Sequence, residues 1–180
     1  MTFLLGIPFV LANEIKPALK TERIKFEGIW VESETMTQRL YKMSGIENVK
    51  TSCENEDHGG IPGSWISRDS AFFRWDGQKS TTAVLSATCT MGKVGFVNHY
   101  WTYLITEDSV TEINLPKLQE FWVTRNGFLG AEYKDSFRGA PSVCDYKHFT
   151  WTFDKLVLDK EWTSKAKGEF HFATCEPFEG

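Results

Sequence analysis

The residues best suited to chemistry in this chain are a histidine and two aromatic residues that share one face of a predicted strand. His99, Trp101 and Tyr103 lie two residues apart, and side chains at i, i+2 and i+4 of a strand point to the same side of a sheet. A neutral imidazole donates one hydrogen bond and accepts one. Within an aromatic wall it would orient a carbonyl or hydroxyl of an apolar ligand. The alternative is a histidine satisfied by a neighbouring strand or by water.

Two further groups complete the predicted ligand-binding set. Trp151 and Phe153 share the apolar face of a later predicted strand. Arg74 stands between two aromatic residues just before a turn, where a guanidinium could hold a carboxylate with two hydrogen bonds. The alternative for Arg74 is a solvated side chain, or one stacked on a neighbouring ring.

Other chemistry is not supported by any motif. The chain has no nucleophile elbow, phosphate-binding loop, H-E-x-x-H pair or dinucleotide fingerprint. None of its 4 histidines stands at metal-ligand spacing from another. The net charge of -4 gives no bulk attraction to nucleic acid. We therefore expect no metal, no cofactor and no nucleic-acid partner, and we assign no catalytic residue.

The elements that would position these residues are mostly strands. The chain of 180 residues contains 7 Trp, 14 Phe and 5 Tyr, and aromatic residues favour strands. From residue 64 onward, apolar and polar residues alternate between turn signals. Asp76-Gly77 and Asn126-Gly127 predict two-residue hairpin turns, in which glycine accommodates a positive φ.

One segment has helical rather than strand periodicity. Met36, Leu40 and Met43 fall on one helical face, which predicts a helix over residues 34–44 that ends at Gly45. We expect no other helix, and residues 46–63 read as a long acidic loop.

These features predict an all-β fold. We expect an antiparallel up-and-down barrel of about eight to ten strands, with one short helix near its N-terminal side. A two-sheet sandwich is the alternative, because a single sheet must close or stack to protect its edges. The predicted barrel domain spans residues 24–180, and residues 1–23 form an apolar extension and a connector.

The stretch Phe26-Glu27-Gly28-Ile29-Trp30, followed by the short helix, resembles the opening of the calycins. This group includes lipocalins, cytosolic fatty-acid-binding proteins and phycobiliprotein lyases. The resemblance implies that Trp30 plugs the closed end of a barrel that encloses a small hydrophobic ligand. The chain has no arginine after Arg138, so it lacks the arginine with which those families hold the ligand or cover the tryptophan.

The N-terminal residues and the cysteines bear on partners and location. Met1–Ala12 is apolar but too short to span a membrane, so we expect it to dock on protein: on its own barrel, on a partner or on a second copy. A membrane face is the alternative. No two cysteines have C-x-x-C spacing, and we expect free, half-buried thiols, with disulfides as the alternative. We expect a cytoplasmic or organellar protein, with secretion as the alternative.

Three functions remain open from the sequence. The leading one is a binding protein for a small hydrophobic or conjugated ligand in an aromatic-lined barrel. The second is an enzyme on the same scaffold, such as a cyclase, isomerase or chromophore lyase, that acts by shaping its substrate and adding one polar group. The third is an accessory subunit that docks through Met1–Ala12 and whose barrel is filled by its own rings.

Overall fold

The computed structural model describes residues 19–55, 64–90, 96–116, 118–134, 142–152, 155–168 and 173–177; the side chains of residues 55, 64–67, 96 and 97 are not part of that description. In chain order the elements are β1 (Leu19–Lys20), β2 (Arg23–Phe26), β3 (Ile29–Glu32), α1 (Ser33–Ser44), α2 (Ile46–Asn55), β4 (Ser64–Arg74), β5 (Thr81–Thr90), β6 (Phe96–Ile105), β7 (Val110–Ile113), β8 (Glu120–Val123), β9 (Gly127–Lys134), β10 (Val143–Thr152) and β11 (Lys155–Lys165). The predicted Phe153 and Met1–Ala12 lie outside the described residues.

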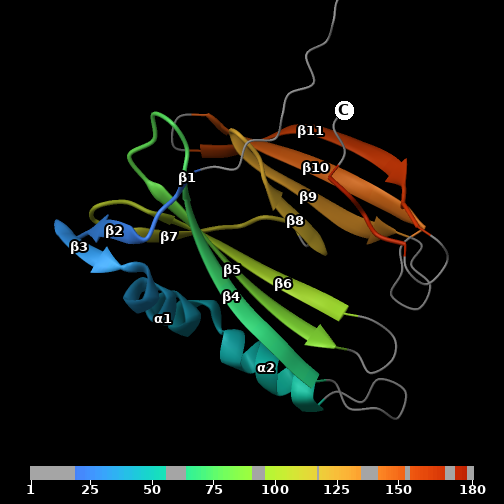
Figure 1. The fold of residues 1–180 in the computed structure, drawn as a ribbon, viewed down its shortest axis with the longest axis horizontal. Coiled ribbons are helices and arrows are strands. Elements are labelled where there is room, and N and C mark those ends of the chain that lie inside the picture. The colour runs from blue at the N-terminus through green and yellow to red at the C-terminus, as the bar shows by residue number, and fades with distance from the viewer. Residues whose placement is uncertain are drawn as a thin grey trace, which may run out of the picture.

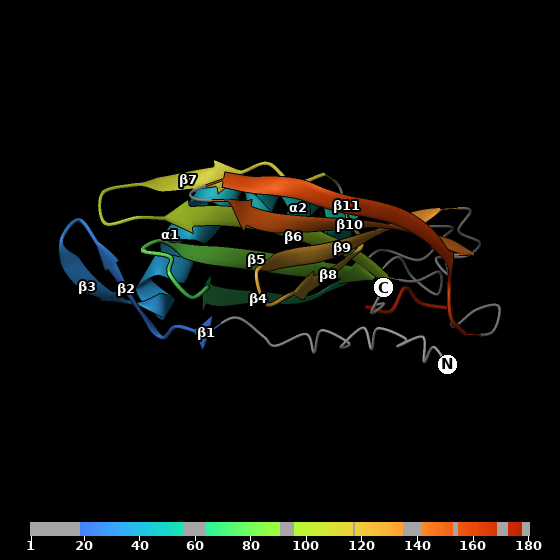
Figure 2. The same cartoon turned by 90° about the horizontal axis from the view of Figure 1, so that it is seen from above.

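The strands form two large antiparallel sheets. The five-stranded sheet has the order β1-β4-β5-β6-β7 and the four-stranded sheet the order β11-β10-β9-β8, while β2 and β3 form a separate hairpin. Helices α1 and α2 lie on one side of β4–β6, and β8–β11 lie on the other side (Figures 1 and 2). The mostly β, antiparallel class is therefore confirmed. Within the described residues no strand pairing joins the two large sheets, so a closed barrel is not confirmed.

The five-stranded sheet buries one face beneath the helices. Leu85 and Tyr103 project from β5 and β6 onto Met36 and Leu40 of α1, and all four side chains are buried. The predicted helix is confirmed as α1, which stops at Gly45, where a φ of 68° provides the left-handed C-terminal cap.

A second helix occupies the segment that we expected to be an acidic loop. Helix α2 covers Ile46–Asn55, so the prediction of a single helix is wrong. Its apolar stripe is short: Ile46 and Cys53 are buried, and Val49 is half-buried. A helix of ten residues with so few apolar side chains is marginal alone, and a disulfide from Cys53 to Cys89 of β5 anchors it.

The other face of the five-stranded sheet packs against the four-stranded sheet. Trp75 lies at the centre of this contact, with its ring centroid 5.0 Å from that of Phe128 and 5.8 Å from that of Trp151. Its indole N–H donates to the carbonyl of Thr124 (3.0 Å). The inter-sheet space at this end is therefore filled by the protein's own rings. The two sheets splay apart toward the right of Figure 1. Lys147 of β10 and Glu132 of β9 form an ion pair across the four-stranded sheet, with Nζ 3.7 Å from Oε2.

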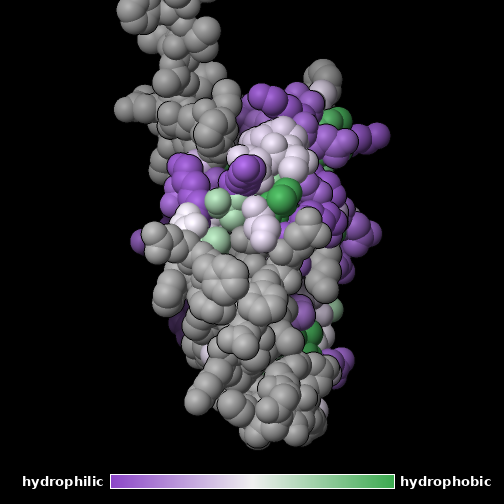
Figure 3. All heavy atoms as spheres, turned by 90° about the vertical axis from the view of Figure 1, so that its right-hand side faces the viewer, coloured by the Kyte–Doolittle hydropathy of each residue, from purple (hydrophilic) through white to green (hydrophobic). Residues whose placement is uncertain are grey.

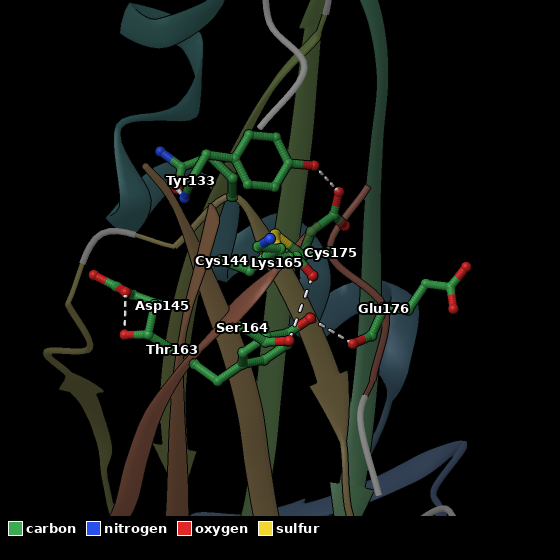
Figure 4. Close-up of a disulfide and its surroundings, with 11 residues drawn as sticks. Tyr133, Cys144, Asp145, Thr163, Ser164, Lys165, Cys175 and Glu176 are labelled. Atoms are coloured by element: carbon green, nitrogen blue, oxygen red, sulfur yellow. Dashed lines mark hydrogen bonds between the residues drawn. A yellow bond between two sulfur atoms is a disulfide. The ribbon is translucent and has the colours of Figure 1, made fainter. Parts of the chain in front are cut away.

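The outer face of the four-stranded sheet is covered by side chains and by the C-terminal segment. Tyr146 stacks on Trp162, with ring centroids 5.1 Å apart and planes 7° apart. The Tyr146 hydroxyl donates to the Glu176 carbonyl (2.7 Å). Beside it, Cys144 forms a disulfide with Cys175 (Figure 4), which ties residues 173–177 to the sheet.

All four cysteines are therefore paired in the structure, as Cys53–Cys89 and Cys144–Cys175. The expectation of free thiols is wrong, and the alternative of disulfides holds. Pairing could not be read from the sequence, because four cysteines allow three connectivities and the fold alone brings the members of each pair together.

Both predicted hairpin turns need correction. Gly77 does adopt the predicted positive φ (81°), but β4 ends at Arg74 and β5 begins at Thr81, so the connection is longer than two residues. In the second turn the Thr124 N–H donates to the Gly127 carbonyl (3.0 Å). The central residues there are Arg125 and Asn126, one position earlier than predicted.

The G-x-W stretch forms a hairpin rather than one continuous strand. Glu27 (φ 50°) and Gly28 (φ 75°) make the two-residue turn between β2 and β3, and positive φ at both positions is the type I′ pattern. Trp30 follows on β3 and is 58% exposed. It therefore does not plug the end of a barrel in this structure.

Two surface observations complete the fold. No helix in the described part of the chain is long and apolar enough to cross a membrane. On the face drawn in Figure 3, the described residues are mostly hydrophilic, with hydrophobic residues only in small, separate patches.

Candidate functional site

A pocket of about 390 Å³ opens where β7 separates from β6. Strand β6 pairs with β5 along its whole length, but β7 pairs only with Thr102–Ile105. Beyond Ile113 the chain moves away from β6 toward β8. The described residues that line the space between are Val49, Asn98, His99, Tyr100, Trp101, Thr102, Glu112, Ile113, Asn114, Leu115, Pro116, Leu118 and Phe121.

The pocket contains aromatic rings from both faces of β6. On the helix side, His99 stacks on Trp101, with ring centroids 6.2 Å apart and planes 24° apart. On the inter-sheet side, Tyr100 stacks on Phe121 of β8 at 5.4 Å and 25°. Because β6 is not covered by β7 here, side chains from both faces reach the same pocket. It is therefore largely aromatic, with a few polar groups.

A polar network holds one end of the pocket in place. The amide nitrogen of Asn98 donates to the Gln119 carbonyl (3.1 Å), and the Thr88 hydroxyl donates to the Asn98 amide oxygen (3.0 Å). The side-chain oxygen of Gln119 accepts from the Tyr133 N–H (2.9 Å). These hydrogen bonds hold the start of β8 against β6 and so maintain the contact between the rings of Tyr100 and Phe121.

Burial controls the ionisation of the groups beside this network. Burial, with the nearby Glu120 carboxylate as a smaller cause, raises the pKa of Tyr100 to about 12. The pKa of Glu120 is raised by burial, although the hydrogen bond that the Tyr133 hydroxyl donates to it opposes the shift. Tyr100 is therefore a neutral phenol at physiological pH. Glu112 is the single charged residue among the described residues that line the pocket.

The structure brings together two of the predicted site residues. His99 and Trp101 both line the pocket. Tyr103 is 0% exposed in the helix-covered core, and Trp151 packs between the sheets. Arg74 donates from Nη2 to the Thr81 hydroxyl (3.0 Å) across the β4–β5 connection. The face that we expected to point into a barrel therefore points toward the helices.

Among the described residues that line the pocket, sequence reasoning identified only His99 and Trp101. Tyr100 stands on the more mixed face of the same strand, and Phe121 and Leu118 come from a segment that carried no prediction of a site. One signal was present: proline is confined to edge strands and strand ends, and Pro116 stands shortly after Ile113, where β7 ends.

The described residues contain no group of three or more His, Cys, Asp or Glu side chains that could hold a metal ion. The chain gave no match to any protein-family model, curated protein or solved structure.

Proposed function

We propose that this protein binds a small, largely apolar ligand with a flat ring in the pocket beside β6. The observation that carries the proposal is the pocket itself: about 390 Å³, within the usual range for small-molecule sites, and lined by aromatic residues with a few polar groups. The Tyr100–Phe121 and His99–Trp101 stacks offer flat surfaces from two sides, which suits a planar ligand.

Each lining group has a defined role in this proposal. Trp101 and Phe121 provide the apolar contact that drives binding. The His99 imidazole and the Tyr100 hydroxyl supply polar contacts, since each of them can both donate and accept a hydrogen bond. Val49 brings α2 to the wall of the pocket, so the position of that helix affects the width of the pocket.

The calycin relationship and the barrel belong to the same proposal. The helix pair that follows the G-x-W hairpin supports it, as does the up-and-down order of strands within each sheet. A closed barrel would pair the outer edge of β11 and slow its amide exchange. Fast hydrogen exchange at those amides of Lys155–Lys165 that point away from β10 would count against closure.

Two observations bear on the other functions and on location. The ring-filled space around Trp75 supports the accessory-subunit alternative, but the pocket at β6 supports ligand binding. An enzyme on this scaffold would use the same pocket, with His99 as the polar group that acts on the substrate. Two disulfides favour an oxidising compartment or secretion over the cytoplasm.

The proposal is tested by titration with N-phenyl-1-naphthylamine, a neutral probe that fluoresces in apolar sites. We expect saturable binding that Trp101→Ala weakens at least about tenfold, because the largest apolar surface of the pocket is lost. Trp30→Ala is the matched control, since Trp30 is exposed on β3, and should leave binding unchanged. Circular dichroism checks that both variants are folded. Equal affinity in wild type and both variants would exclude this pocket.

A further inference from the structure

The hydrogen-bonding direction of β6 can be followed from its paired end into the pocket. The Thr106 N–H donates to the Ser109 carbonyl (2.9 Å). From there the register with β7 runs without a break to Thr102↔Ile113. In an antiparallel pair the residues alternate between those that exchange hydrogen bonds and those that do not. The backbone N–H and C=O groups of Leu104 and Thr102 therefore point away from β5 and form hydrogen bonds with β7, the last strand at this edge of the sheet.

Tyr100 is the next residue in this alternation. Its backbone N–H and C=O point to the same outer edge, but the chain beyond Ile113 has moved away from β6. Among the described residues none forms a hydrogen bond to either group. His99 and Trp101, on either side of Tyr100 in the chain, both line the pocket. The Tyr100 N–H and C=O therefore face the space that a ligand would fill. Tyr100 as a residue is half-buried, and backbone groups that are kept from water are normally paired.

The geometry of an extended residue selects a particular ligand group. Its N–H and C=O lie side by side and point in nearly the same direction. They are matched by a molecule that carries an acceptor and a donor next to each other on one edge. A lactam or a primary carboxamide has this arrangement, because its C=O and N–H are adjacent and coplanar.

The charge of the pocket argues in the same direction. Glu112 is the one charged group among the described lining residues, and a ligand carboxylate would be repelled by it. A neutral amide has no such cost. The stacked rings on either side also favour a group that is coplanar with an aromatic system.

We propose that the pocket takes a neutral aromatic lactam or carboxamide, whose C=O accepts from the Tyr100 N–H and whose N–H donates to the Tyr100 C=O. This inference rests on the proposed ligand-binding function and specifies its chemical class. The side chains of the pocket then supply the apolar contact. The ligand pairs with the backbone of Tyr100 in the way that a neighbouring strand would.

The test compares three probes of nearly the same shape. 2-Quinolinone carries the adjacent C=O and N–H, whereas coumarin replaces the N–H by oxygen and N-methyl-2-quinolinone replaces it by N–CH₃. We expect both analogues to bind at least about fivefold more weakly than 2-quinolinone by calorimetry, because the Tyr100 carbonyl is left unpaired.

A backbone change makes the test specific to Tyr100. Incorporating the α-hydroxy acid analogue of tyrosine at position 100 replaces its N–H by an ester oxygen and keeps the side chain. We expect 2-quinolinone to bind at least about fivefold more weakly to this protein, while N-phenyl-1-naphthylamine binds as before. The same change at Tyr103, which is buried in the helix-covered core and whose N–H points to β5, is the control; it should lower the melting temperature and preserve the preference for the lactam.

The outcomes separate this inference from the proposed function. If N-phenyl-1-naphthylamine binds but the three probes bind equally, the lactam assignment is wrong and the pocket remains a ligand site. If the ester at Tyr100 leaves 2-quinolinone affinity unchanged, the assignment is also wrong. If neither the naphthylamine nor any of the three probes binds, both proposals fail.

Discussion

The two large sheets differ in how their outer faces are covered. Each shares one face with the other sheet and must cover the opposite face. The five-stranded sheet is covered by α1 and α2, and the four-stranded sheet by its own stacked rings and residues 173–177. A disulfide ties each cover in place. The stacked rings fill the outer surface of the four-stranded sheet. On the five-stranded sheet, the helices and the end of β7 leave space at the edge of β6. The pocket lies on the side with the looser cover.

Removing each disulfide in turn should give the largest effect and tests whether the covers of the two sheets differ in their role. The bridges join residues 36 and 31 positions apart, so loop entropy predicts a similar loss of about 4 kcal/mol of unfolding free energy for each pair of Cys→Ser changes. Only the pair at Cys53 and Cys89 should also weaken naphthylamine binding, because it frees the helix that carries Val49. Denaturant unfolding and probe titration measure the two effects. Weaker binding in the Cys144 and Cys175 variant alone would reverse our assignment of roles.

Two glycines give a smaller and more local contrast. A Cβ on Gly127 would overlap the Phe149 carbonyl of β10, whereas at Gly77 it would meet no atom within 4 Å. Gly127→Val should therefore cost about 3 kcal/mol through steric overlap. Gly77→Val should cost only about 1 kcal/mol, from its positive φ. Thermal melts of both variants check the order, and equal costs would mean that β10 does not approach Gly127 closely.

These glycines also show what a sequence reveals and what it hides. Local signals were sufficient for the strands and for α1, because alternation and the spacing of Met36 and Leu40 depend on neighbouring residues alone. The requirement for glycine at position 127 comes from a strand that follows some twenty residues later. Helix α2 was missed because its apolar stripe is only three residues long and its anchor is a disulfide.

The site was only partly predictable for the same reason. His99 and Trp101 could be grouped, because two residues on one strand share a face. Tyr103 lies outside the pocket because α1 packs over it. Tyr100 and Phe121 lie inside the pocket because β7 does not pair with this part of β6. Both are properties of tertiary structure.

The smallest expected effect concerns two carboxylates of the four-stranded sheet with opposite shifts. Burial raises the pKa of Glu120 above its ordinary value of 4.5, so its contribution to stability is full below about pH 4.5 and is lost as the pH rises through the folded pKa. Glu120→Gln should therefore raise the melting temperature at pH 7, and the difference should vanish in acid.

Glu132 is the matched control for that experiment. The ammonium of Lys134, which donates a hydrogen bond to its carboxylate, lowers its pKa. Its contribution is present above about pH 4.5 and is lost as the pH falls through the folded pKa. Glu132→Gln should lower the melting temperature at pH 7 and have no effect in acid. Shifts of the same sign in both variants would contradict the assigned environments.

The location of the ligand can be measured directly with fluorine labels on the tryptophans. The chain has 7 of them; Trp101 lies in the pocket, while Trp75 and Trp151 lie between the sheets. In protein labelled with 5-fluorotryptophan, each resonance is assigned by a single Trp→Phe change. On addition of N-phenyl-1-naphthylamine we predict that the Trp101 resonance moves and that those of Trp75 and Trp151 stay. Movement of Trp75 and Trp151 with Trp101 unchanged would place the ligand between the sheets and contradict the pocket at β6.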